Sequence, residues 1–197
     1  HMFSMMVRGE QPIALLGRAD AGFHARLKTF LDADHVVITP DMVGEICRRI
    51  EALPGEHPRV GVPSLGEYPK FFTDALYETG AEIVDITEAF VVAKAPKAPY
   101  ELQLIQEASD LAIAAFEEVV KYIRPGVTEK EVIGYAEGYL RAHGAEDLLI
   151  LSRGEYPHAF INRPTFRCIE KDDLFVFSVE IAGVYGYWTQ IIRPIFL

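Results

Sequence analysis

Two strongly apolar stretches near the end of the 197-residue chain, LFVFSVEIA and YGYWTQIIRP, each contain polar residues. A polar side chain inside an apolar strand needs a partner, because burying it unpaired costs free energy. Carboxylate oxygens at such positions are typical ligands of hard divalent ions, so the two stretches could carry a metal site, the remains of one, or neither. The polar residues are Ser178, Glu180, Thr189 and Gln190.

A β-hairpin must position these residues, and the surrounding sequence predicts one between Asp172 and Pro194. Val, Ile, Phe, Tyr and Trp dominate both stretches, and a short Gly-containing turn separates them. This pattern is typical of two antiparallel strands. Side chains alternate along a strand, so Ser178 and Glu180 are expected on the same face.

The composition is that of an ordinary globular protein with an excess of acidic residues. The formal net charge is -10, which disfavours a nucleic-acid backbone or an anionic membrane as partner. No apolar run approaches the ~18 residues of a membrane span, and no signal peptide is recognisable. A cytoplasmic protein is therefore expected. Cys47 and Cys168 form no CxxC pair, which indicates neither a disulfide framework nor a thiolate metal site.

Strand and helix signals alternate through the first part of the chain and predict a small α/β domain, residues 1–94. Its opening, Phe3–Glu10, contains little that would start a domain, so the domain is expected to lack its own beginning. Strands are predicted at 11–17, 35–39, 59–62 and 81–86, helices at 41–53 and 67–79, and a helix or an irregular excursion at 19–31.

A Pro- and Lys-bearing linker, AKAPKAP, follows Val92 and predicts the boundary to a second domain, residues 95–197. Its first helix has apolar residues at i, i+4 and i+7 spacing. Thr128 and Glu131 have the spacing of a capping box, and Gly144 is typical of the residue behind a helix end. The expected elements are helices at 100–123 and 128–143, a strand at 148–151, a connection at 153–171 and the hairpin.

The order of motifs from Ala95 onward resembles the pita-bread family, which includes creatinase, prolidase and aminopeptidase P. The resemblance implies an α/β creatinase-like N-terminal domain followed by an incomplete α+β pita-bread domain, of which residues 95–197 are the first half. The second half would supply a metal-ligand His and two Glu. The motifs are KAPYE (97–101), IRPGVTEKEV (123–132), LRAHGAED (140–147), GEYPH (154–158), Asp172-Asp173 and Gly186-Tyr187.

The resemblance also implies what the hairpin should hold. Metallopeptidases of this family place one Asp on each strand, because two hard ions about 3.5–4 Å apart need anionic oxygen ligands. Here the first position falls on Ser178 or Glu180, depending on where one extra residue is placed, and the second falls on Gln190. A neutral Gln does not replace an acid, so no normal dimetal centre is expected. Glu180 alone could hold one weakly bound Mn, Co or Zn ion.

His158 is the residue for which the resemblance implies a catalytic role. In the family, a His at this point of the loop lies by the scissile bond, and in metal-free creatinase it acts as the base. The alternative is a solvated loop His. Strand aromatics are usually core residues, but here they could line a substrate pocket. The residues expected to orient or line the substrate are Glu180, Arg163, Arg167, Tyr187 and Trp188.

The sequence therefore predicts a creatinase- or aminopeptidase P-like hydrolase acting on a peptide or a small C–N bonded substrate. The alternative is a pita-bread homologue without catalysis that works as a binding or assembly module. The chain ends on an apolar strand, which leaves an open edge. We expect it to be inactive alone and to associate through that strand, as a homodimer or with a separate C-terminal half.

Overall fold

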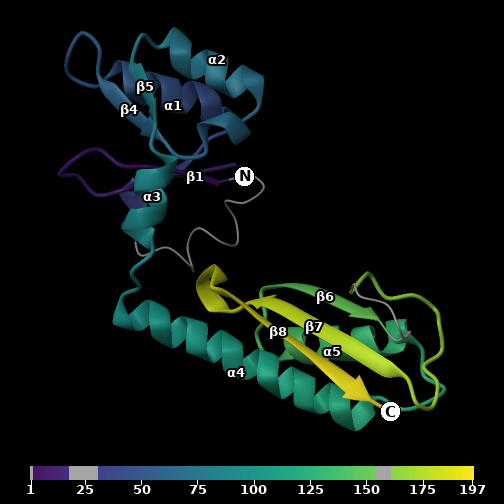
Figure 1. Cartoon of the computed structure of the whole chain (residues 1–197). Coiled ribbons are helices and arrows are strands. Elements are labelled where there is room, and N and C mark those ends of the chain that lie inside the picture. The colour runs from purple at the N-terminus through teal and green to yellow at the C-terminus, as the bar shows by residue number, and fades with distance from the viewer. Residues whose placement is uncertain (1, 18–30, 154–160) are drawn as a thin grey trace. The chain divides into compact units, whose positions relative to one another are not determined.

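The computed structural model describes residues 2–17, 31–153 and 161–197. The chain divides into two compact units, an N-terminal unit of residues 1–96 and a C-terminal unit of residues 97–197. Figure 1 shows the elements of each unit with their labels. Each unit has a hydrophobic core of its own.

The N-terminal unit alternates strands and helices around the apolar side chains of Leu15, Ile50 and Leu76, which are fully buried. β1 pairs antiparallel with β2, which pairs parallel with β3, and β4 pairs parallel with β5. The elements are β1 (Met2–Met5), β2 (Ile13–Leu16), β3 (Val36–Ile38), α1 (Met42–Glu51), β4 (Arg59–Val62), α2 (Lys70–Glu78), β5 (Glu82–Asp85) and α3 (Thr87–Lys94).

Local sequence signals account for most of these boundaries. Asp41 caps α1, because its side chain accepts a hydrogen bond from the Gly44 N–H at 2.9 Å. The helix expected at 67–79 begins only at Lys70, since a 3₁₀ turn and Pro69 precede it. The structure differs from the expectations in two further places: Met2–Met5 add a strand, and α3 occupies part of the expected linker. The stretch 19–31 lies almost wholly outside the described residues.

The C-terminal unit packs two helices against one face of an antiparallel three-stranded sheet (Figure 1). The strand order is β6-β7-β8, so that β7 is central. Between β7 and β8 the chain makes a short 3₁₀ turn, η3. The elements are α4 (Pro99–Tyr122), α5 (Glu129–Ala142), β6 (Asp147–Arg153), β7 (Leu174–Ala182), η3 (Val184–Gly186) and β8 (Trp188–Phe196).

The core of this unit lies between the helices and alternate residues of β7. Phe175, Phe177, Val179 and Ile181 are fully buried, as period-two alternation requires for one covered face. On the helices the buried positions are small or branched, and Ala residues on α4 let the helix approach the sheet closely. The helical core residues are Ala112, Ala115, Val119, Val132, Ile133, Ala136 and Leu140.

The ends of α5 follow the sequence signals. The Thr128 hydroxyl oxygen accepts a hydrogen bond from the Glu131 N–H, and the Glu131 carboxylate accepts one from the Thr128 N–H at 2.7 Å. This confirms the predicted capping box. Gly144 has a φ of 101°, a left-handed conformation that suits Gly behind a helix end.

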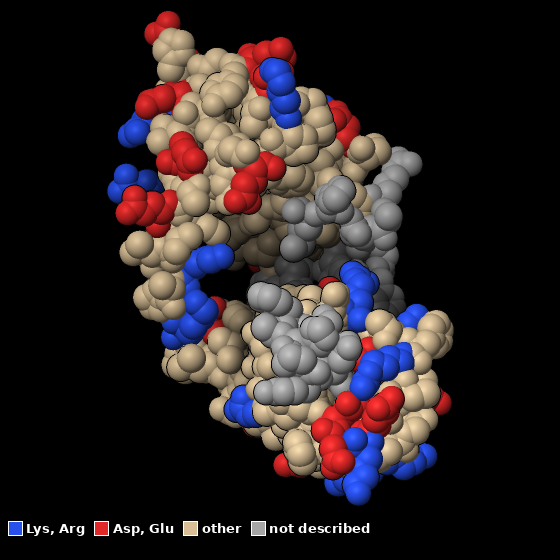
Figure 2. All heavy atoms as spheres, turned by 45° about the vertical axis from the view of Figure 1, so that its right-hand side comes forward, with Lys and Arg blue, Asp and Glu red and all other residues tan. Residues whose placement is uncertain are grey.

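Charged side chains of both signs are interspersed over the face of the molecule shown in Figure 2. In the part of the chain that the structure describes, no helix has the length and apolar character needed to cross a membrane.

Candidate functional site

The register of the hairpin places Glu180 directly opposite Gln190. The Gln190 side-chain amide donates a hydrogen bond to the Glu180 carboxylate, with Nε2 and Oε1 2.8 Å apart. Ser178 lies opposite Ile192. Of the two residues that the sequence offered for the first position, Glu180 is therefore the one that meets Gln190.

These side chains lie on the sheet face opposite α4 and α5, which we call the open face. Alternation assigns Leu149, Ser178, Glu180, Trp188, Gln190 and Ile192 to it. Leu149, Trp188 and Ile192 are 39%, 51% and 39% exposed, whereas Ser178 is completely buried. Each row across the strands therefore combines polar and apolar groups, with the Glu180–Gln190 pair flanked by an exposed indole.

The neighbouring aromatic, Tyr187, is directed the other way. Its hydroxyl donates a hydrogen bond to the Glu101 carboxylate at the beginning of α4, with the two oxygens 2.7 Å apart. That hydrogen bond, which favours the protonated phenol, raises the pKa of Tyr187 to about 12. Tyr187 and Trp188 were predicted together as pocket residues, but the structure places only Trp188 on the open face.

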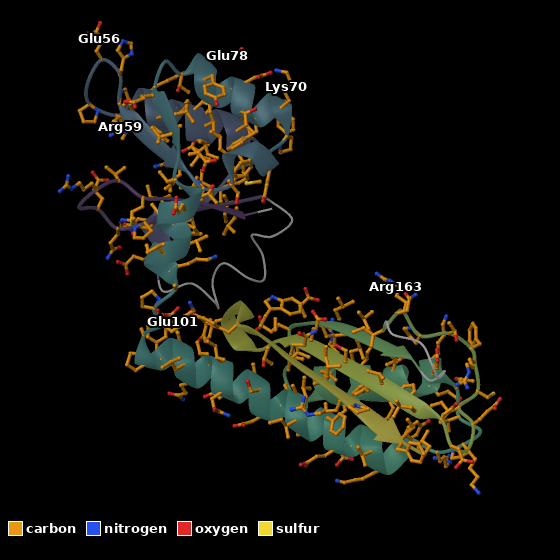
Figure 3. All side chains as sticks on the ribbon, in the orientation of Figure 1. Glu56, Arg59, Lys70, Glu78, Glu101 and Arg163 are labelled. Carbon is orange, nitrogen blue, oxygen red and sulfur yellow. The ribbon has the colours of Figure 1, made fainter. Side chains whose placement is uncertain are left out.

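The two predicted arginines lie in different environments. The Arg167 guanidinium forms a two-pronged ion pair with Asp173, with Nη2–Oδ1 and Nη1–Oδ2 distances of 2.9 and 2.8 Å. The hydrogen bond from Arg167 lowers the pKa of Asp173. Arg163 is exposed on the connection between β6 and β7, and Figure 3 shows its side chain pointing outward.

The described end of this connection is anchored to the start of α5. Glu129 is only 4% exposed, and its carboxylate accepts hydrogen bonds from the Thr165 N–H and hydroxyl at 2.9 and 2.8 Å. In the main chain, the Ile169 N–H donates to the Val127 carbonyl and the Gly126 N–H donates to the Ile169 carbonyl, each at 2.8 Å. His158, the predicted base, lies in the stretch 154–160, outside the described residues.

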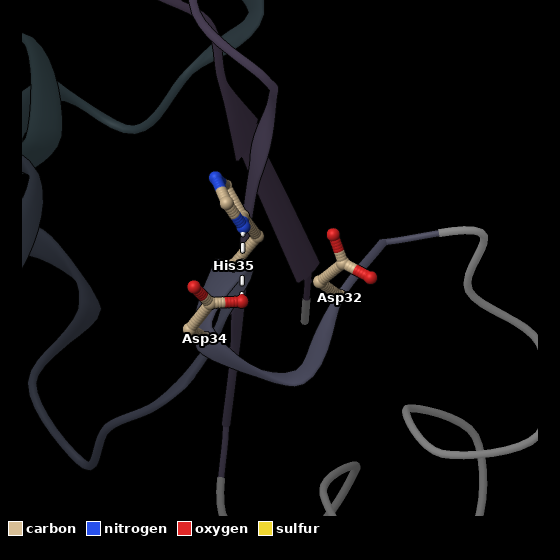
Figure 4. Close-up of side chains that lie close together, drawn as sticks. All are labelled: Asp32, Asp34 and His35. Carbon is tan, nitrogen blue, oxygen red and sulfur yellow. Dashed lines mark hydrogen bonds and ion pairs between the residues drawn. The ribbon is translucent and has the colours of Figure 1, made fainter.

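A group able to hold a metal ion lies in the N-terminal unit (Figure 4). Asp32, Asp34 and His35 offer ligand atoms within 4.8 Å of one another, and His35 Nδ1 is 3.2 Å from Asp34 Oδ1. Both carboxylates are exposed, and exposed acidic groups of this kind are common without an ion. The sequence analysis did not predict this group.

Sequence reasoning missed Glu101 as a contact of the hairpin. Its spacing after Ala98 is that of a residue capping its own helix, and its carboxylate does accept the Ala98 N–H at 2.7 Å. The contact with Tyr187 joins residues 86 positions apart, a separation that local pattern does not address. Thr189, singled out as a polar strand residue, bonds Ser109 of α4 at 3.0 Å.

Comparison with known proteins points to one family. The sequence model of Metallopeptidase family M24 matches residues 103–197. The uncharacterized peptidase YqhT of Bacillus subtilis is 28% identical over 122 residues, 58% of this chain and 33% of that protein. A methionine aminopeptidase of Geobacillus stearothermophilus is 43% identical over 47 residues, 24% of this chain and 92% of that sequence.

A solved structure, the prolidase from Pyrococcus horikoshii, is similar in fold, with a TM-score of 0.74 at 21% sequence identity. The match covers 95% of this chain and 52% of the prolidase chain. The chain thus spans about half the length of this solved structure and a third of the Bacillus peptidase.

Proposed function

The chain belongs to metallopeptidase family M24, and from this premise we propose that the whole protein hydrolyses a C–N bond in a peptide or a small amidine-like substrate. We further propose that residues 1–94 form a creatinase-like N-terminal domain and residues 95–197 part of a pita-bread domain. The observation that carries the proposed function is the hydrogen-bonded pair of Glu180 and Gln190 on the open face.

This pair does not fit a dimetal centre at the hairpin. Two adjacent divalent ions need several anionic oxygen ligands, whereas the pair offers one carboxylate and one neutral carboxamide. The amide nitrogen of Gln190 is directed at Glu180, so the carboxamide already uses one of its two N–H donors within the pair. We therefore derive no step of the reaction through a metal held by these two residues.

Most of the hydrogen-bonding groups that the pair leaves for a ligand are acceptors. Glu180 uses Oε1 to accept one Gln190 N–H, which leaves the acceptors Glu180 Oε2 and the Gln190 carbonyl oxygen, together with the second Gln190 N–H. The exposed indole of Trp188 lies on the same face and can attract a cation. Two acceptors beside an aromatic ring suit an ammonium or amidinium group, and they disfavour an anionic one.

His158 is proposed as the general base. The oxygen of a water molecule would form a bond to the carbon of the C–N group while His158 accepts the water proton. The same proton would then pass to the leaving nitrogen as the C–N bond breaks. Glu180 would hold the cationic group of the substrate, and Arg163 would orient its other end. Arg167 is already paired with Asp173.

The test is a turnover assay of the full-length protein with Xaa-Pro peptides and small amidines, with and without a chelator. We expect chelator-resistant turnover that falls at least about a hundredfold in His158→Ala. Glu180→Gln should raise KM for the cationic substrate, while the exposed α4 control Glu117→Gln should match wild type. Activity that requires about two Mn, Co or Zn ions per chain would contradict the proposal.

A binding module without catalysis is the second candidate, favoured by Gln190 where the family resemblance implies an acid. In that case calorimetry would show amidine binding that Glu180→Gln removes, with no turnover of any substrate. Turnover abolished by His158→Ala would exclude this candidate.

We also propose that the chain self-associates through β8, one of the two edge strands of the sheet in the described C-terminal unit. Phe196 of this strand is 75% exposed, and an edge strand has unpaired backbone groups. Light scattering that shows a stable monomer at all concentrations would contradict this proposal.

A further inference from the structure

The turn between β7 and β8 has a conformation that needs support. Tyr185 has φ 66° and ψ 16°, and Gly186 follows with φ 76°. A left-handed conformation costs a residue with a side chain on the order of 1 kcal/mol. Within the turn, Gly186 N–H bonds the Gly183 carbonyl at 3.1 Å, and Gly183 N–H bonds the Tyr187 carbonyl at 3.1 Å.

Helix α4 contacts this turn from one side. The Glu101 carboxylate accepts the Tyr187 hydroxyl at 2.7 Å, and Figure 3 shows Glu101 at the beginning of the helix, beside the turn. Two helical turns along, α4 approaches Gly183 so closely that an added Cβ would lie 3.0 Å from the Ala108 Cβ. The helix therefore holds the turn at both of its ends.

Glu101 is itself fixed to its own helix. One carboxylate oxygen accepts the Ala98 N–H at 2.7 Å, while the other accepts Tyr187. These two hydrogen bonds lower the pKa of Glu101, the one from Ala98 most. The carboxylate thus connects the first turn of α4 to the residue that begins the return strand.

The geometry of a hairpin turn sets the register of its strands, and a slip of one residue moves every side chain to the other face. Glu180 meets Gln190 only in the observed register. We infer that Glu101 is a positioning residue, which acts through the Tyr187 hydroxyl to hold the β7–β8 turn and thereby sets Trp188 and the Glu180–Gln190 pair on the open face. The importance of this pair rests on the proposed function.

The test measures the turn without any substrate. Amide hydrogen exchange of Gly183 and Gly186 should become about tenfold faster in Tyr187→Phe, because a hydrogen bond to a charged acceptor is lost. Glu101→Ala should accelerate the same amides to a similar degree. The double variant should add little to either single change, because both remove one contact.

Tyr187→Phe separates the inferred role from a general weakening of α4. Glu101→Ala also removes the cap at Ala98, so exchange at the start of α4 should rise in that variant. Tyr187→Phe leaves the cap in place, and exchange at 100–103 should stay at the wild-type rate. Glu117→Gln, an exposed position of α4, is the matched control for a lost carboxylate.

Trp188 provides a second readout, because it is the only Trp in the chain. Its emission should change in Tyr187→Phe and in Glu101→Ala and should remain unchanged in Glu117→Gln. Wild-type exchange and emission in Tyr187→Phe would overturn the inference. Neither measurement requires catalysis. If the protein shows no hydrolase activity, hydrogen exchange and Trp188 emission still test whether Glu101 positions the turn.

Discussion

Phe177 and Ser178 are adjacent on β7, yet their side chains lie on opposite faces of one sheet. On the face toward α4 and α5, the central strand β7 presents fully buried apolar side chains, Phe175, Phe177, Val179 and Ile181. The open face combines the Glu180–Gln190 pair with exposed apolar groups. One face of the sheet thus provides most of the folding free energy through burial, so the other face can carry polar groups such as the Glu180–Gln190 pair.

The largest expected effect distinguishes the two faces by stability. Phe177→Ala should lower the free energy of unfolding of the C-terminal unit by about 3–5 kcal/mol, because it leaves a cavity in the core. Trp188→Ala, on the open face, should cost less than about 1 kcal/mol, since the indole is already half exposed. Urea unfolding followed by circular dichroism measures both, and equal losses would contradict the comparison.

An acid-dependent effect is expected from the Arg167–Asp173 ion pair. The pKa of Asp173 is lowered in the folded protein. Its contribution to the free energy of unfolding is therefore fully present above the ordinary Asp pKa of about 3.9. It is lost as the pH falls through the lowered value. Asp173→Asn should cost about 1–3 kcal/mol at pH 7 and should reduce the acid sensitivity of unfolding.

The matched change on the open face is Glu180→Gln, which also converts a carboxylate to an amide. Because this position is partly solvated, we expect a change within about 0.5 kcal/mol at pH 7. Unfolding free energies at pH 7 and pH 3 for both variants provide the comparison. A larger loss in Glu180→Gln than in Asp173→Asn would show that the open face also stabilises the fold.

Two adjacent residues of β8, Thr189 and Gln190, allow the two faces to be compared with smaller expected effects. Thr189 bonds Ser109 on the helix side, and Thr189→Val should cost about 0.5–1.5 kcal/mol of stability. Gln190→Leu should change stability by less than about 0.5 kcal/mol but should weaken binding of a cationic ligand. In chemical denaturation, Thr189→Val should therefore have the larger effect. In calorimetry of ligand binding, Gln190→Leu should have the larger effect.

The smallest expected effects are gains in stability. Ser152 on the helix face and Ser178 on the open face are both buried, and their hydroxyls have no hydrogen-bond partner among the described residues. Ser152→Ala and Ser178→Ala should each stabilise the unit by up to about 1 kcal/mol, because an unsatisfied group is removed. A loss in Ser178→Ala alone, in thermal unfolding, would indicate that this hydroxyl has a partner on the open face.

Local sequence patterns are sufficient to predict the elements of the C-terminal unit. Apolar spacing predicts α4, the Thr128–Glu131 capping box predicts the start of α5, and two β-rich stretches around a Gly-containing turn predict the hairpin. These signals are local, since each depends on residues within one helix turn or one strand. For the same reason the motif order was sufficient to identify the family, and strand alternation was sufficient to place Ser178 and Glu180 on one face.

Which of those two residues meets Gln190 is visible only in the folded chain, because register depends on the geometry of the turn and on its packing against α4. The structure likewise separated Tyr187 from Trp188 and paired Arg167 with Asp173. Each of these arrangements depends on contacts between segments that are distant in the sequence. The hydrogen bond between Tyr187 and Glu101 is the clearest example. A hydrogen bond across 86 positions leaves no periodic trace in the sequence, so it becomes visible only when the chain is folded.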